Sequence, residues 1–182
     1  SPTPATDTPA LSPSVSFVKV ASALASETAF GAFDPSTRLT WPGTSSLPAL
    51  KHLGITREPI DLILITHFHG DHFAGLPFLL LDAQFTRRAR PLVIAGPQGI
   101  ETKLKAAMEV MFEHSSRTQP RFGLSTVALN PEETRTFGGV TVTPYPVVHG
   151  ESGGPFLAYR IEAEGRTICY SADTEWTDTL IP

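Results

Sequence analysis

A short histidine-rich segment carries the residue types most suited to chemistry. The string T-H-F-H-G-D-H, residues 66–72, places three imidazoles and one carboxylate within six positions. This mixture of nitrogen and oxygen ligands is favoured by zinc and similar metals. His67 and His69 are two residues apart, so in an extended segment their side chains leave on the same side. The intervening glycine allows a tight turn, after which Asp71 and His72 can face a neighbouring position. The spacing predicts two metal ions side by side.

The elements that must position this segment can be read from the hydrophobic pattern. The β-branched apolar run at 59–66 predicts a buried strand that ends at the histidines. Helices with apolar residues at helical spacing or typical ends are predicted at 47–54, 75–85 and 98–113. Further strands are predicted at 14–24, 90–97, 121–129, 139–148, 155–163 and 166–173, with a turn at Glu164-Gly165. A middle of mixed helices and strands followed by consecutive strands favours a sheet sandwich with helices outside.

The string HFHGDHFAGLP, residues 67–77, resembles the signature of the metallo-β-lactamase superfamily. It is most similar to the ribonuclease Z-like and cyclic phosphodiesterase branches, and the resemblance covers residues 47–182. It implies an α+β fold, an αββα sandwich with the site at one edge of the two sheets. It also implies that His67 and His69 bind the first metal, and that Asp71 and His72 bind the second.

The resemblance points to two more ligands, each at the end of a predicted strand. His149 in PVVHG would complete the first ligand set, and Asp173 in ICYSADT would bridge both metals. The family usually has glycine where Ala172 stands. It also supplies one more histidine after the bridging aspartate, whereas here 182 − 173 = 9 residues follow and none is histidine. The resemblance therefore predicts a domain that is incomplete at its C-terminus.

The function implied by the resemblance is metal-dependent hydrolysis, of the phosphodiesterase type. Two Zn²⁺ ions, with Mn²⁺ or Fe²⁺ as alternatives, would activate water, and Asp71 would act as the catalytic proton acceptor. The alternative is a truncated, non-catalytic remnant that still binds metal. A tRNA-processing role is not favoured, because 173 − 149 = 24 residues leave no room for a tRNA-gripping arm between His149 and Asp173.

Chain length and charge indicate how many domains the protein has and which kinds of substrate it could bind. The 182 residues are enough for one domain, with formal net charge −4 and scattered basic residues. The one short basic run, Arg87, Arg88 and Arg90, is interpreted as a solvated loop edge. We therefore expect a small-molecule or phosphodiester substrate and no dedicated nucleic-acid-binding patch. A homodimer is left open.

Other features of the sequence predict where the domain begins and in which cellular compartment the protein is found. Residues 1–14, rich in Pro, Ser and Thr, are predicted to be a disordered tail, and residues 15–182 a partial domain. The single cysteine, Cys169, excludes an internal disulfide and is interpreted as a small core residue. With no apolar run of about 18 residues, we expect no membrane span and a cytoplasmic protein. Asp61 is interpreted as a surface residue, and His52 and His114 as solvated.

Overall fold

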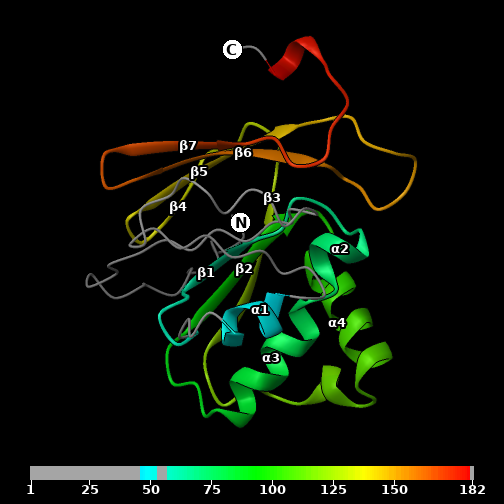
Figure 1. Ribbon diagram of the computed structural model, residues 1–182, viewed down its shortest axis with the longest axis vertical. Coiled ribbons are helices and arrows are strands. Elements are labelled where there is room, and N and C mark those ends of the chain that lie inside the picture. Colours follow the sequence, from blue (N-terminus) through cyan, green and yellow to red (C-terminus); the bar gives the residue numbers. More distant parts are fainter. Residues whose placement is uncertain (1–45, 53–56, 181–182) are drawn as a thin grey trace, which may run out of the picture.

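Two β-sheets packed face to face, with helices outside one of them, make up the part of the protein that the computed structural model describes, residues 46–52 and 57–180 (Figure 1). The helices are α1 (Ser46–His52), α2 (Gly70–Phe73), α3 (Leu76–Phe85) and α4 (Ile100–Met111), with short 3-10 turns η1 (Ser115–Arg117) and η2 (Asp178–Leu180). The strands are β1 (Leu62–Leu64), β2 (Leu92–Pro97), β3 (Leu124–Leu129), β4 (Arg135–Phe137), β5 (Val140–Pro146), β6 (Leu157–Ala163) and β7 (Arg166–Tyr170).

The first sheet is parallel, in the order β1-β2-β3, and lies between the helices and the second sheet (Figure 1). Strands β1 and β2 are apolar and buried throughout, because both of their faces are covered. Strand β3 is only half-buried over most of its length and includes Ser125 and Thr126. Ile63 packs into the core shared with α3 and α4, whereas its neighbour Leu64 packs into the core between the two sheets. The continuous apolar run that predicted a buried strand therefore reflects two cores, one on each side of β1.

The second sheet is antiparallel, in the order β4-β5-β6-β7. The turn between β6 and β7 is confirmed at Glu164 and Gly165, which have φ angles of 51° and 72°. Two consecutive positive φ values suit the tight hairpin turn whose twist matches that of its strands. Tyr159 of β6 ties the two sheets together, because its buried hydroxyl donates a hydrogen bond to the carbonyl of Ile65 at 2.6 Å.

The predicted α+β class with two sheets is confirmed, with some differences in detail. The helices of the described ranges all lie against the first sheet, and within those ranges no α-helix covers the outer face of the second (Figure 1). Strand β4 was not predicted, because three residues, two of them polar, carry no clear alternation. The predicted tail at 1–14, the strand at 14–24 and the helix end at Gly54 lie outside the described residues.

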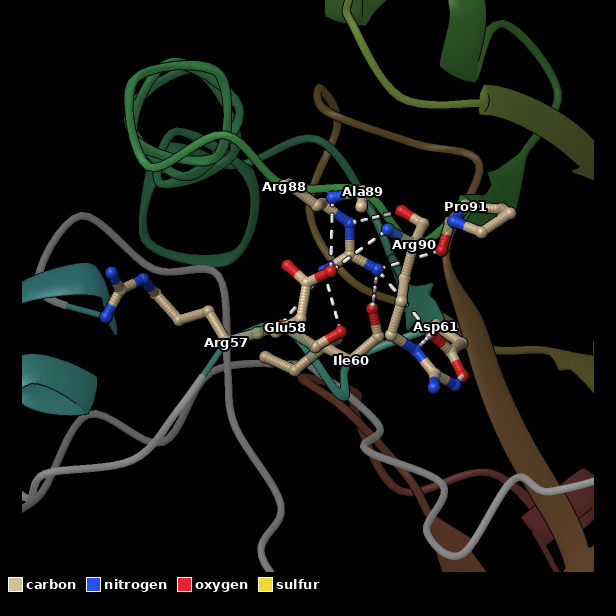
Figure 2. A network of polar contacts seen from close by, with 8 residues as sticks. All are labelled: Arg57, Glu58, Ile60, Asp61, Arg88, Ala89, Arg90 and Pro91. Carbon is tan, nitrogen blue, oxygen red and sulfur yellow. Dashed lines mark hydrogen bonds and ion pairs between the residues drawn. The ribbon is translucent and has the colours of Figure 1, made fainter.

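A buried arginine corrects two sequence interpretations. Arg88 is not at a solvated loop edge: it is 5% exposed and donates hydrogen bonds to five backbone carbonyls (Figure 2). These acceptors lie in the segments that lead into β1 and β2: Arg57, Glu58, Ile60, Arg90 and Pro91. Asp61 is likewise buried rather than on the surface, and it pairs with Arg88 and Arg90. The network fixes the entry of both strands into the sheet.

Other side-chain interpretations can also be compared with the structure. Cys169 is exposed, which contradicts its assignment to the core. In the described part of the chain β7 is the last strand of its sheet, and Ile168 faces the inter-sheet core, so the next residue must face away. His52 and His114 are exposed, as expected. None of the helices in the described part of the chain reaches the length and apolar character that crossing a bilayer requires.

Candidate metal centre

The six predicted ligands come together where strands of both sheets end. The segment with His67 and His69 follows β1 and leads into α2, which carries Asp71 and His72. His149 follows β5 of the second sheet, three residues after its last residue. Asp173, after β7, lies beside His149 and His72. The centre thus lies at one edge of the two sheets, where the family resemblance placed it.

Three imidazoles form the first group of donors. One ring nitrogen from each of His67, His69 and His149 lies within 4.8 Å of the others. Nε2 of His69 is 2.7 Å from the carbonyl of Ser152, which can only accept, so Nε2 carries the proton and Nδ1 keeps its lone pair. That Nδ1 atom is 3.1 Å from Nε2 of His67. Two nitrogens bound to one tetrahedral zinc would be about 3.3 Å apart, given Zn–N bonds of about 2.0–2.1 Å.

The second group combines imidazole and carboxylate. Donor atoms of His67, His72 and Asp173 lie within 4.8 Å of one another. His72 is buried, and its Nε2 is 3.1 Å from Oδ2 of Asp173 and 3.4 Å from Oδ2 of Asp71. A neutral imidazole has one free lone pair, so His67 can serve only one ion. With His67 in the first group, the second consists of His72, Asp173 and Asp71.

Electrostatics keep the central histidine in the form that binds metal. His67 is fully buried, and burial lowers its pKa to about 4, with repulsion from His72 and His69 adding to the shift and Asp173 opposing it. The imidazole is therefore neutral at pH 7. Its Nδ1 is 3.1 Å from the hydroxyl oxygen of Thr66, which can accept from Nδ1–H and leave Nε2 for a metal. The donor set, its spacing and its protonation all fit a divalent ion such as zinc.

The loop after His149 holds the first group in place and was not recognised in the sequence. We call residues 150–156 the clasp segment. The amide of Phe68 donates to the carbonyl of Gly153 at 2.7 Å, next to the bond from His69 to Ser152. Gly153 has φ +89°, and a Cβ there would lie 2.3 Å from Cδ2 of His69, so only glycine fits. The adjacent glycines at 153 and 154 were the available signal for a close backbone approach.

Ala172 shows why the family usually has glycine at this position. Its φ is +58°, in the left-handed region that costs an L-residue about 1–2 kcal/mol. The next residue is Asp173, which this turn directs toward His72 and His149. The strained conformation persists next to the proposed bridging ligand, as is common where a site fixes the backbone.

Comparisons with known proteins agree with the fold and the site. Residues 32–182 match the family model described as "Beta-lactamase superfamily domain". Ribonuclease Z of Agathobacter rectalis is 44% identical over 75 residues, which are 39% of this chain and 25% of that protein. Ribonuclease Z of Staphylococcus carnosus is 31% identical over 134 residues, which are 71% of this chain and 41% of that protein. The chain thus spans about a quarter to two fifths of the length of these relatives.

Solved structures show the same fold. The metallo-beta-lactamase fold protein YhfI from Bacillus subtilis has a TM-score of 0.56 at 24% identity, over 77% of this chain and 52% of that one. The short form of human tRNase Z has a TM-score of 0.54 at 24% identity, over 72% of this chain and 56% of that one. At this identity the likeness concerns the fold alone.

Proposed function

The chain belongs to the beta-lactamase superfamily, and we propose that it is a metal-dependent hydrolase that acts on phosphodiesters. The observation that carries this proposal is the convergence of four imidazoles and two carboxylates from both sheets at one edge of the sandwich. We propose zinc as the metal. His67, His69 and His149 would hold one ion, Asp71 and His72 the other, and Asp173 would bridge them.

Bound metal would supply a Lewis acid and lower the pKa of a coordinated water toward 7. The chain's own residues would do the rest. His67 is neutral, and the hydrogen bond from Nε2 of His69 to Ser152 leaves Nδ1 of His69 directed toward Nε2 of His67. Asp71 has a side chain that is 60% exposed and lies next to His72, so it is open to substrate and solvent. That position suits a group that accepts a proton from the attacking water.

Phosphodiesters are proposed on the resemblance of the HFHGDHFAGLP string to the phosphodiesterase-like branch and on an aspartate at the bridging position. A second candidate is RNA cleavage, because the relatives described above are named ribonuclease Z. An RNA backbone is itself a phosphodiester, so the chemistry at the metals would be shared. The remaining alternative is a chain that binds metal without catalysis.

Turnover of matched substrates tests the reaction class. We expect the zinc-loaded chain to hydrolyse an aryl phosphodiester faster than a β-lactam or a thioester, because two adjacent ions stabilise the charge on a phosphoryl group. Initial rates at equal substrate concentrations would measure this. Faster turnover of the β-lactam or thioester would overturn the assignment. Faster cleavage of a short single-stranded RNA than of the aryl ester would favour the second candidate.

A further inference from the structure

One phenyl ring contacts all three imidazoles of the first group. The centroid of Phe156 lies 5.3 Å from that of His67, 5.8 Å from His69 and 5.2 Å from His149. The ring planes are inclined by 54° to His67 and 58° to His69, which are tilted contacts, and by 78° to His149, where the edge of one ring meets the face of the other. Phe156 thus presents one apolar surface to three imidazoles, two of which follow β1 of the first sheet and one of which follows β5 of the second.

The backbone holds this ring in register with both ligand-bearing segments. The carbonyl of Phe156 accepts a hydrogen bond from the amide of Val147 at 3.1 Å, two residues before His149. The amide of Leu157 donates to the carbonyl of Thr66 at 3.0 Å, immediately before His67. The peptide group that links Phe156 to Leu157 is therefore hydrogen-bonded to both ligand-bearing segments, which places Phe156 relative to His67 and His149.

Within the clasp segment, the backbone at Gly154 packs against another side of the Phe156 ring. A Cβ on Gly154 would lie 2.9 Å from Cε2 and 3.1 Å from Cδ2 of Phe156, so the Gly154 backbone is packed directly against the phenyl group. The ring cannot move that way. The half-buried ring is thus restricted by backbone on one side and by imidazoles on another.

We infer that Phe156 is a positioning residue that pre-organises His67, His69 and His149 for metal binding. The inference rests on the proposed metal centre. Each imidazole has two rotatable bonds, and fixing them before the ion arrives removes an entropy cost from binding. The phenyl group also excludes water from one side of the donors, and such an apolar surround tunes a metal site. Neither effect needs Phe156 to touch the ion or the substrate.

Zinc affinity tests this role. We expect Phe156→Leu to weaken zinc binding by about 10-fold or more, the scale on which groups that orient metal ligands act. Phe156→Tyr keeps the ring and should stay within about 3-fold of the original affinity on the same reasoning. Phe137→Leu is the matched control, because Phe137 is 4% exposed in the inter-sheet core, on β4. Competition with a chromogenic chelator measures all of these affinities.

The outcomes separate the inference from the proposed function. Unchanged zinc affinity in Phe156→Leu, or an equal loss in Phe137→Leu, would overturn the inference while leaving the metal centre intact. A second readout needs no metal: imidazole ¹⁵N spectra of the stripped chain should change at the three histidines in Phe156→Leu and stay constant at exposed His114. Such changes in a chain that binds no zinc would refute the metal centre and the metal-binding role together, while confirming that the ring orders the histidines.

Discussion

Replacement of Asp71 with asparagine is expected to lower phosphodiester turnover by about 100- to 10,000-fold, the range that a positioned proton acceptor contributes. The amide keeps the shape of the side chain but cannot take a proton from water and is a poorer ligand than a carboxylate. Asp71 is exposed and, among the described residues, its side chain makes a polar contact with His72, so the fold should tolerate the change. Steady-state rates on an aryl phosphodiester would measure the effect.

Asp178→Asn is the matched control for this substitution. Asp178 is an exposed aspartate in η2, outside both groups of donors, and its conversion should change the rate by less than about 3-fold. A zinc content equal to that of the unmodified chain, together with a rate that falls less than 3-fold in Asp71→Asn, would remove Asp71 from the proposed catalytic role.

Arg88→Ala is expected to cost about 3–5 kcal/mol of unfolding free energy, the loss typical when one partner of a buried charged network is removed. Five backbone carbonyls would each lose the hydrogen bond from Arg88, and the buried carboxylate of Asp61 would keep its ion pair with Arg90 (Figure 2). Burial lowers the pKa of Arg88, while attraction to Glu58 and Asp61 acts to raise it. Arg88→Lys should also destabilise the chain, because a single ammonium cannot reach five acceptors.

Arg87→Ala provides the comparison one residue away. Arg87 is exposed, and within the described part of the chain its side chain makes no hydrogen bond or ion pair, so its loss should cost less than about 0.5 kcal/mol. Urea unfolding of the variants would give both values. Equal stabilities of Arg88→Ala and Arg87→Ala would show that the network in Figure 2 does not support the fold.

The sequence predicted the features that depend on neighbouring residues. The apolar runs before the histidines and at β2 marked buried strands, and the Glu164-Gly165 pair marked a hairpin. The H-x-H-x-D-H spacing identified a donor cluster from one short segment, since its members are positioned by the same strand and turn. The proposed ligands His149 and Asp173 could be predicted only from the family resemblance, because nothing in their local sequence links them to residues some 80 to 100 positions earlier.

Features set by distant contacts were missed or misread. Arg88 and Asp61 were interpreted as surface residues, because charged side chains are rarely fully buried without a partner. Each is the other's partner, but Asp61 precedes β1 and Arg88 precedes β2, so the sequence pattern does not show the pairing. Cys169 was placed in the core without knowledge that β7 is the last strand of its sheet in the described part of the chain. The clasp segment escaped notice because its role depends on where its backbone carbonyls point, which side-chain patterns do not report.

The central claim is that this donor cluster binds metal, and zinc retention tests it most directly. The stripped chain would be equilibrated with zinc, dialysed against metal-free buffer and subjected to elemental analysis beside a His67→Ala, His69→Ala double variant. The unmodified chain should retain zinc, whereas the double variant should lose the first group, since two of its three imidazoles are gone. A zinc content that is the same in both proteins would contradict the account.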